Sequence, residues 1–339
     1  MLTELESDAF VASIHSFDLL IDARSPEEFG ESHIPKAHNY FALSNAEHEE
    51  VGTLYKQVSR NDAKVLGASY ICTNASFHVR NIYAKHRIGA RIGIYCARGG
   101  LRSSSLALIL SSIGYQVFKL RSGYKSYRNY VLHYLETCPH ERFIVLGGNT
   151  GCGKTELLQH LTPSIDLEGL AHHMGSSFGH VKGAQPCQKA FENALVDKLS
   201  AIDASEAIFI EGESKRMGSI TIPSILHTKM QQGFRVEITA PIEQRVEQIL
   251  KDYDNVDASF FHHAMERITP YIKKSAKEEA LLAFQSHDLH RVATILLLEY
   301  YDKVYKKPLR IDATVDNTHT QEALVQLVKM STRSFQKPV

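Results

Sequence analysis

A cysteine followed by two glycines and two arginines is the residue of this chain best suited to nucleophilic chemistry. Cys96 begins the segment C-A-R-G-G-L-R-S, which follows a predicted buried strand at 92–95 and precedes a predicted helix at 104–110. Glycines let consecutive backbone N–H groups point at one spot, and the start of a helix adds partial positive charge there. Arg98 and Arg102 add full charges, so the arrangement favours the thiolate of Cys96, the form that attacks electrophiles.

These features predict a reactive cysteine in an anion cradle. The alternative is a buried structural cysteine beside a glycine-rich turn. The predicted catalytic residues are Cys96, Arg98 and Arg102. The predicted cradle also contains Gly99, Gly100, Leu101 and Ser103.

A second anion-binding pattern lies in the C-terminal half of the chain. Residues 147–155 read G-G-N-T-G-C-G-K-T, between a predicted buried strand at 143–146 and a predicted helix at 156–161. In this context the pattern G-x-x-x-x-G-K-T indicates a phosphate-binding loop: amides cradle a diphosphate, Lys154 neutralises it, and the Thr155 hydroxyl suits Mg²⁺. The motif predicts that a di- or triphosphate binds here. It does not by itself predict that ATP is hydrolysed. The predicted diphosphate-binding residues are Gly148, Asn149, Thr150, Gly151, Cys152, Gly153, Lys154 and Thr155.

Three other segments supply candidate partners for this phosphate site. An apolar strand at 207–210 ends in acids where a Walker B strand normally places Asp, and glutamate there argues against fast NTP hydrolysis. Residues 165–179 lack helical periodicity and predict a substrate loop. Residues 235–246 resemble the strand and helix of small P-loop kinases, whose helix arginine approaches the phosphates. The candidate Mg²⁺ or substrate residues are Asp166, Glu168, Glu211, Glu213 and Arg245.

Charge is unevenly distributed, although the net charge is zero. Residues 1–62 carry 12 acidic and 4 basic side chains, whereas residues 63–140 carry 11 basic and 1 acidic. This pattern indicates either a polyanionic partner near Cys96 or two halves that neutralise each other in the fold. In residues 121–130 cations alternate with tyrosines, which predicts either RNA contacts or an amphipathic helix whose tyrosines pack on the sheet. The candidate RNA-contacting residues are Arg121, Tyr124, Lys125 and Arg128.

Length and composition predict a two-domain protein of the cytoplasm. A chain of 339 residues exceeds one ordinary core, and no apolar run reaches the roughly 18 residues of a membrane span. The N-terminus lacks the pattern of a signal peptide, and the 5 cysteines include no C-x-x-C pair, which fits a reducing compartment. The 18 histidines show no metal-ligand spacing, so we expect no structural metal.

A polar segment containing Pro139 predicts the domain boundary. We expect a first domain at 1–137, a linker at 138–142, a P-loop domain at 143–332 and a tail at 333–339. The residues 256–305 predict a helical C-terminal part.

The N-terminal motifs resemble the rhodanese domain. The pattern D-x-R-s-x-x-E-F beginning at Asp22 is followed by H-I-P-x-A beginning at His33 and then by the cysteine loop. The resemblance implies that Cys96 is the carrier and that Asp22, Arg24 and His33 are structural. The loop from cysteine to second arginine is longer than in sulfur-transferring rhodaneses and resembles that of rhodanese-related phosphatases, although Tyr95 replaces their usual histidine. A wider cradle suits phosphate or a bulkier chalcogen donor such as selenophosphate.

Over residues 8–310 the chain resembles the tRNA 2-selenouridine synthases. The motifs C-x-R-G-G-x-R-S, G-x-T-G-x-G-K-T and D-L-E-G-L-A-x-H-x-G-S-S-F-G occur in this order, and Met174 departs from the arginine usual in that family. The resemblance implies an α/β fold: a rhodanese-like parallel-sheet domain, then a P-loop NTPase-like (kinase-like) domain with a helical C-terminal part.

The same resemblance implies a transferase that acts on the wobble 2-thiouridine of a tRNA anticodon stem-loop. Geranyl diphosphate alkylates the sulfur, and selenium from selenophosphate then replaces S-geranyl to give 2-selenouridine, with Cys96 as chalcogen carrier or nucleophile. It implies no tightly bound cofactor and no membrane partner, and Mg²⁺ is a candidate at the P-loop. Whether the P-loop holds geranyl diphosphate or a nucleotide is open. The alternatives are a rhodanese-related phosphatase or a sulfurtransferase, either one with a nucleotide-binding P-loop module.

Overall fold

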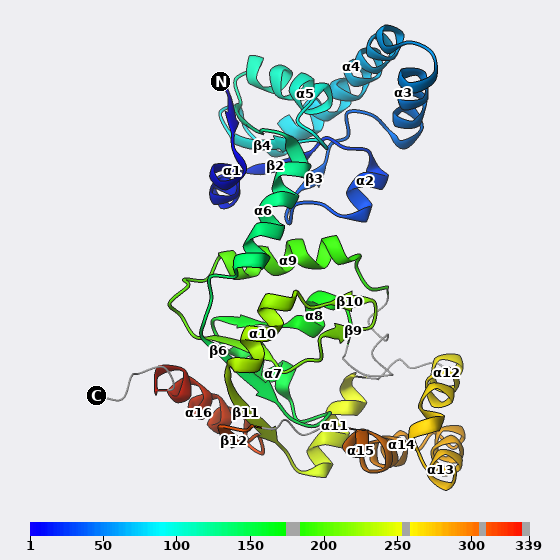
Figure 1. Ribbon diagram of the computed structural model, residues 1–339. Helices are drawn as coiled ribbons and strands as arrows, with labels where there is room; N and C mark the ends of the chain where they lie inside the picture. The colour runs from blue at the N-terminus through cyan, green and yellow to red at the C-terminus, as the bar shows by residue number, and fades with distance from the viewer. Residues whose placement is uncertain (174–183, 253–257, 305–309, 334–339) are drawn as a thin grey trace. The chain divides into compact units, whose positions relative to one another are not determined.

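The computed structural model describes residues 1–173, 184–252, 258–304 and 310–333, and it divides the chain into two compact units (Figure 1). The first unit comprises Met1–Glu136 with Glu192–Asp197, and the second comprises Thr137–Phe191 with Lys198–Val339. Each unit contains a five-stranded sheet in which all neighbouring strands run parallel. The predicted two-domain α/β fold is therefore confirmed.

The sheet of the first unit has the strand order β1-β5-β4-β2-β3. Its strands are β1 (Leu2–Leu5), β2 (Leu19–Asp22), β3 (His38–Asn39), β4 (Arg91–Tyr95) and β5 (Gln116–Leu120). Strand β2 is buried along its whole length and β4 along all but its first residue, as expected for inner strands of a parallel sheet. Asp22 pairs with Tyr95 at the carboxyl ends of β2 and β4, so the residues that follow both strands lie at one edge.

Helices cover both faces of this sheet (Figure 1). They are α1 (Ser7–Ser13), α2 (Pro26–Glu31), α3 (Asn45–Gln57), α4 (Arg60–Lys85), α5 (Leu101–Ser112) and α6 (Gly123–Thr137). Helices α3 and α4 pack against each other, and the sequence analysis made no prediction for them. Helix α2 begins in a capping box, because Ser25 accepts from the backbone N–H of Glu28 while the Glu28 side chain accepts from the N–H of Ser25.

The sheet of the second unit has the strand order β12-β11-β6-β8-β7. Its strands are β6 (Phe143–Gly147), β7 (Ser164–Ile165), β8 (Ile208–Glu211), β11 (Phe234–Thr239) and β12 (Ala313–Asp316), and β9 (Arg216–Met217) with β10 (Ile220–Thr221) forms a separate hairpin. Strand β6 is buried throughout and lies between β11 and β8. The chain leaves β6 toward β7 on one side of the sheet and later passes from β8 to β11 on the other side of β6, and such a switch point is where open α/β sheets bind ligands.

The helices of the second unit include a distinct helical part. The helices around the sheet are α7 (Lys154–His160), α8 (Leu167–Ala171), α9 (Gln188–Ser200), α10 (Ser224–Gln232) and α16 (Thr320–Arg333). The helical part comprises α11 (Ile242–Asp252), α12 (Ala258–Ile268), α13 (Lys274–Gln285), α14 (Leu289–Leu296), a π-helical turn (Leu297–Tyr301) and α15 (Asp302–Val304), around its own apolar core. This confirms the predicted helical C-terminal part. None of the helices in the described ranges has the length and apolar character needed to cross a bilayer.

Candidate active sites

The Cys96 loop is held from outside by the start of α6. Tyr124 N–H donates to the carbonyl of Cys96 at 2.8 Å, and Lys125 N–H donates to the carbonyl of Ala97 at 3.1 Å. Gly123 has a φ of 61°, and a Cβ on it would lie only 2.1 Å from the Cys96 carbonyl oxygen. Only glycine fits this close approach, so Gly123 shapes the loop although it lies outside the cysteine motif.

The backbone amides of residues 97–103 include those of the residues predicted to form the cradle. Within the described residues, none of these N–H groups donates a hydrogen bond to a protein acceptor. They span the loop and the first turn of α5, where a helix leaves its N–H groups without intrahelical partners. Unpaired amides next to a helix N-terminus favour an anion, and anion binding by this loop stays a prediction.

The thiol of Cys96 lies between a polar and an apolar surface. Ser103 Oγ lies 3.1 Å from Cys96 Sγ and can donate to it. Cys96 is 2 % exposed and packs in an apolar cluster with Ala23, Ala42, Leu43 and Ile71. The predicted cradle residue Ser103 is therefore a direct partner of the sulfur. The apolar side of this environment was not predicted from the sequence.

The two predicted arginines differ in their surroundings. Arg102 forms a two-contact ion pair with Glu28, the same residue that closes the capping box of α2. Burial raises the pKa of Glu28, but the hydrogen bond and charge of Arg102 outweigh it, so the pKa is lowered and the carboxylate stays charged. Arg98 is exposed, and no ion pair to it is found in the described part of the chain. Of the two arginines, Arg98 is thus the one whose charge no carboxylate of the described residues neutralises. The sequence analysis had treated the two arginines alike.

Residues of the rhodanese-like motifs build the support behind the loop. Asp22 and Arg24 are 0 % and 4 % exposed and form an ion pair with an N···O distance of 2.6 Å. The Arg24 guanidinium lies 4.0 Å from the ring centre of Tyr124, and the Tyr124 hydroxyl donates to Ser32 Oγ at 2.8 Å. The Nδ1 of His33 lies 2.9 Å from the carbonyl oxygen of Phe29. Asp22, Arg24 and Tyr124 therefore have packing contacts in this structure.

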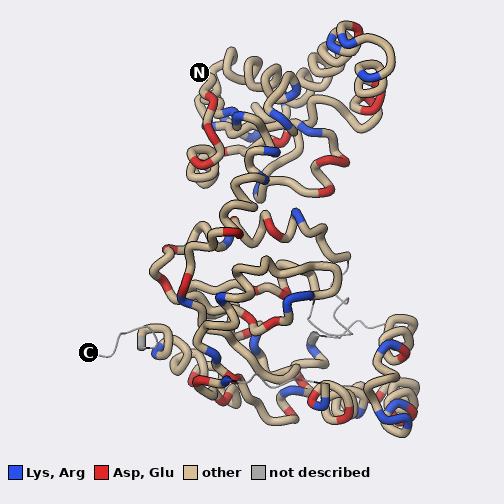
Figure 2. Tube along the Cα trace, in the orientation of Figure 1, with Lys and Arg blue, Asp and Glu red and all other residues tan. Residues whose placement is uncertain are grey.

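Ion pairs within the first unit join its acid-rich and basic segments. Lys119 pairs with Glu4 and Arg121 pairs with Glu6, each at 2.6 Å. Arg102 also pairs with Glu28. Figure 2 shows both signs of charge along the first unit. The neutralisation that the sequence analysis left open therefore accounts for part of the charge asymmetry.

The candidate RNA-contacting residues of α6 have different surroundings. Arg121 is engaged by acids, Tyr124 is buried, and Arg128 forms an ion pair with Glu192, which clusters with the first unit. Lys125 is exposed, and no ion pair to it is found among the described residues. The tyrosine packing follows the amphipathic-helix alternative, and RNA contact by this helix stays a prediction.

The phosphate-binding loop connects β6 to α7 as predicted. Gly151 has a φ of 83°, and a Cβ on it would lie 2.6 Å from the carbonyl oxygen of Arg245, so α11 packs directly against the loop. Among the described residues, no acceptor is found for the N–H groups of Gly151, Gly153, Lys154 or Thr155. Lys154 Nζ donates to the carbonyl of Gly148 at 2.8 Å, which folds the lysine over the loop. Amides and a lysine thus lie at the position where the sequence predicts a diphosphate.

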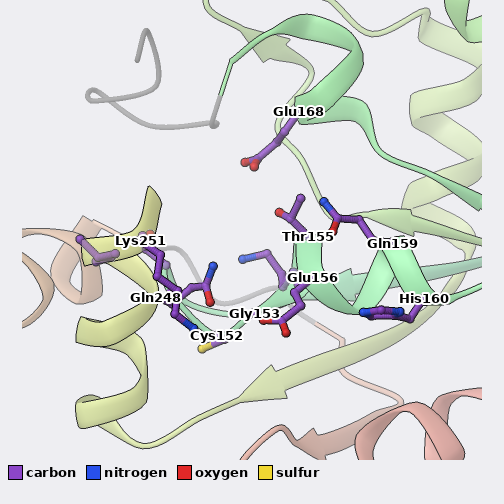
Figure 3. Close-up of a pocket in the computed structure, with 13 residues that line it drawn as sticks. Cys152, Gly153, Thr155, Glu156, Gln159, His160, Glu168, Gln248 and Lys251 are labelled. Carbon is purple, nitrogen blue, oxygen red and sulfur yellow. The ribbon is translucent and has the colours of Figure 1, made fainter. Parts of the chain in front are cut away.

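A cavity of about 480 Å³ opens beside this loop (Figure 3). Glu168 points into it near Thr155, and Gln248 and Lys251 line it from α11. The sequence analysis missed Gln248 and Lys251. Gln248 follows Arg245 by three residues and Lys251 follows Gln248 by three, and that helical spacing was the signal that could have identified them.

The carboxyl groups of Glu211, Glu168 and Glu213 are partly or fully buried near the phosphate-binding loop. Strand β8 neighbours β6, and at its end Glu211 accepts from Thr155 Oγ1 at 3.2 Å and from the N–H of Glu168 at 2.9 Å. Burial and the charge of Asp166 raise the pKa of Glu211 to about 8, against the opposing hydrogen bond from Glu168 N–H. Burial also raises the pKa of Glu168 and of Glu213, whereas the positive charge of Lys154 opposes both shifts. Positive charge delivered to this site would therefore stabilise the ionised carboxylates.

The donor set at Thr155 and Glu211 fits Mg²⁺. No cluster of three or more His, Cys, Asp or Glu side chains suited to a metal occurs in the described residues. A Mg²⁺ ion bound through phosphates needs only one or two protein oxygens and keeps water as its other ligands. A hydroxyl and a carboxylate at 3.2 Å are oxygen donors of this kind.

Arg245 holds the phosphate-binding loop through Asp302. Its Nε donates to the carbonyl of Thr150 at 2.9 Å, and its Nη1 and Nη2 donate to Asp302 at 3.0 and 2.6 Å. Asn149 Nδ2 donates to the same carboxylate at 2.9 Å. Arg245 is 6 % exposed, so this predicted phosphate ligand is fully engaged in a network that joins α15 to the loop. Asp302 was missed, because no local pattern links it to a loop 153 positions earlier.

The substrate loop predicted at 165–179 is described only in part. Asp166 accepts from the N–H of Gly169 at 2.6 Å and caps α8. Met174 and the G-S-S-F-G segment at 175–179 lie outside the described residues.

Comparison with known proteins identifies relatives of both units. A model of the rhodanese-like domain matches residues 6–130, and a model of the tRNA 2-selenouridine synthase AAA domain matches residues 141–278. A tRNA 2-selenouridine synthase of Hydrogenovibrio crunogenus is 32% identical over 91% of this chain and 95% of its own. Proteins of the same name from Psychromonas ingrahamii and Cupriavidus necator are 34% and 35% identical, over 73% and 84% of this chain and 68% and 87% of their own.

Replacing the buried acid of β8 should change how stability depends on pH. The raised pKa of Glu211 means that the folded protein keeps a proton that the unfolded chain loses above about pH 4.3. The free energy of unfolding of the wild type should therefore fall as pH rises from 5 to 8, and Glu211→Gln should reduce that slope by up to about 1.4 kcal/mol per pH unit. Urea denaturation in EDTA measures the slope, with Glu322→Gln on an exposed part of α16 as the control. If the free energy of unfolding changed with pH at the same slope in the wild type and in Glu211→Gln, the raised pKa of Glu211 would be contradicted.

Removing the carboxylate that holds Arg245 should destabilise the second unit. Asp302→Ala leaves a buried guanidinium without its ion pair, which costs about 3 kcal/mol. Glu279→Ala removes an exposed pair with Arg291 in the same helical part and should cost less than about 1 kcal/mol. Chemical denaturation of both variants tests the difference, and equal losses would show that the Arg245 network has no special role.

Proposed function

The chain belongs to the tRNA 2-selenouridine synthase family, and from this premise we propose that it converts the wobble 2-thiouridine of tRNA to 2-selenouridine. The observation that carries the proposal is the similarity over 91% of the chain to a relative of that name, in a chain that retains two sites for anionic groups. One site surrounds Cys96 and the other lies at the phosphate-binding loop. The proposed substrate of the enzyme is the tRNA anticodon stem-loop. The cysteines of the described residues are free, which favours the reducing environment of the cytoplasm.

The proposed reaction has two steps, because sulfur is a poor leaving group until it is alkylated. In the first, the 2-thio sulfur attacks the first carbon of geranyl diphosphate, the carbon–oxygen bond breaks, diphosphate leaves, and the base loses its N3 proton. In the second, selenium takes the place of S-geranyl at C2. Geranylthiolate is a far better leaving group than a sulfide dianion, so the first step prepares the second.

The phosphate-binding loop is the proposed site of the first step. Its unpaired amides and Lys154 would hold the diphosphate of the geranyl donor and stabilise it as it leaves. Mg²⁺ held by Thr155 and Glu211 would supply further positive charge to that diphosphate when bound. This use of the site requires no ATP hydrolysis, and glutamate in place of the usual Walker B aspartate supports that reading.

Cys96 is the proposed nucleophile of the second step. Selenium in selenophosphate is already at the selenide level, so a perselenide on the cysteine would require an oxidant. A balanced route has the Cys96 thiolate attack C2 and expel geranylthiolate, after which selenophosphate attacks C2 through selenium and expels the cysteine. Water then cleaves the selenium–phosphorus bond, which releases phosphate and returns the proton to N3. Ser103, the loop amides and Arg98 would stabilise the thiolate and the phosphate.

Lys154→Ala should abolish geranylation. The variant removes the cation over the phosphate-binding loop, and loss of such a donor typically lowers kcat by about a hundredfold or more. Nucleoside mass spectrometry of tRNA incubated with geranyl diphosphate measures the product, and Lys329→Ala on α16 is a control with the same loss of charge. Full geranylation by Lys154→Ala would refute the assignment of the first step to this loop.

Cys96→Ser should let geranylated tRNA accumulate when both co-substrates are present. The first step does not need the thiol, whereas a hydroxyl is too weak a nucleophile for the second. Cys72→Ser, at an exposed position of the same unit, should give wild-type levels of 2-selenouridine. Selenation by Cys96→Ser at the wild-type rate would eliminate the cysteine as nucleophile.

A further inference from the structure

An apolar groove lies between α3, α4 and the start of α5 in the first unit. Its volume is about 230 Å³, and its lining side chains include Leu43, Val51, Ile71 and Leu101. Tyr55 and Leu101 stand at its rim and are 48 % and 62 % exposed, which is unusual for large apolar residues. The proposed function does not use this groove, either at Cys96 or at the phosphate-binding loop.

Small residues of α4 keep the groove open. Ala63, Gly67 and Ile71 follow one another at four-residue spacing, so they lie on one face of the helix, and Ala68 adjoins them. A Cβ on Gly67 would already lie 3.4 Å from Val51 on α3. A longer side chain on this face would therefore occupy the space between the two helices.

The groove shares side chains with the apolar cluster that packs around Cys96. Leu43 and Ile71 line it and also belong to the cluster in which Cys96 is buried. Arg102 and Ser105 of α5 line it as well, so its wall includes the helix that begins at the cysteine loop. An apolar group in the groove would thus contact two residues of the cluster in which Cys96 is buried.

The apolar lining of the groove favours hydrocarbon, and the positive charge at its edge is compatible with a polyanion. Apart from Lys64, Arg102 and Ser105, the lining residues are apolar or carry a tyrosine ring, and no carboxylate is among them. Burial of hydrocarbon there contributes roughly 25 cal/mol per Å². Lys64 lines the groove and is exposed, and its positive charge would favour a nucleic acid backbone at the edge of the groove.

We propose that this groove binds the prenyl chain on the sulfur of the S-geranylated nucleoside while Cys96 attacks the neighbouring carbon. The proposal rests on the proposed function and adds a subsite to its second step. Binding of the chain would place C2 against Cys96 Sγ and would hold the geranylthiolate as it leaves. The groove would therefore make selenation selective for long S-alkyl groups.

The test compares two anticodon stem-loop oligonucleotides, one with S-geranyl-2-thiouridine and one with S-methyl-2-thiouridine. With selenophosphate, the wild type should show a kcat/KM at least about tenfold higher for the geranyl substrate, because S-methyl leaves the groove empty. Ala68→Phe, at an exposed position of α4, should lower kcat/KM about tenfold for S-geranyl and less than twofold for S-methyl. Ala84→Phe, an exposed alanine of α4 outside the groove, is the matched control and should match the wild type with both.

A second variant separates the inference from misfolding. Tyr55→Glu places a charge on the half-exposed rim, where the fold tolerates it, and should show the same selective loss for S-geranyl. Equal losses for both oligonucleotides, or no loss in either variant, would overturn the groove while leaving the proposed function standing. Selenation of neither oligonucleotide by the wild type would overturn both. A dimer that Ala68→Phe dissociates in sedimentation would assign the groove to a second copy of the chain instead.

Discussion

Both candidate active sites depend on backbone amides left unpaired where a parallel strand gives way to a helix. The first turn of any α-helix has N–H groups without intrahelical partners, and a parallel sheet places that turn directly after a strand end. In the first unit β4 leads through the Cys96 loop into α5, and in the second β6 leads into α7. Neither site needs a dedicated set of charged ligands, because the fold itself supplies donors for an anion. What distinguishes the sites is the side chain placed among these donors, a thiol in one and a lysine in the other.

The parts of these sites that sequence could predict are those set by neighbouring residues. Two glycines before a helix, or a G-K-T at its start, fix the local backbone whatever surrounds them, so both loops and their flanking elements were predicted. Partners brought in by tertiary packing were not. Glu28 reaches Arg102 across 74 positions, and Asp302 reaches Arg245 across 57, with no periodicity to connect them. The α3–α4 pair was also missed, because no residue of α3 is fully buried and the buried face of α4 consists largely of alanine and glycine, which give a weak hydrophobic signal.

Charge compensation divides the predicted functional residues into two groups. Arg102 and Arg245 each meet a carboxylate, so they hold their loops in shape, whereas Arg98 meets none within the described residues and Lys154 meets only loop carbonyls. The carboxyl groups of the second unit show the opposite imbalance. Glu211 is buried and Glu168 is half-buried, and the pKa of each is raised, so the charge of Lys154 does not fully offset the cost of burying these carboxylates. A diphosphate alone would repel these acids, and a divalent cation between the two would satisfy both. This argument favours joint binding of cation and diphosphate over binding of either alone.

The surroundings of Cys96 suit a reaction whose two partners differ in polarity. A sulfurtransferase or phosphatase needs only the polar side of such a site, because its substrates are small anions. Here Ser103 and the loop amides offer hydrogen-bond donors, while Leu43 and Ile71 present hydrocarbon to the same cysteine. A nucleophile that must expel an alkylthiolate and then accept an anionic donor would use both surfaces in turn. An apolar wall also excludes water from the carbon under attack, which protects an activated base from hydrolysis before selenium arrives. The proposed chemistry would therefore use the apolar half of the site as well as the amides, and the cysteine motif alone does not reveal that half.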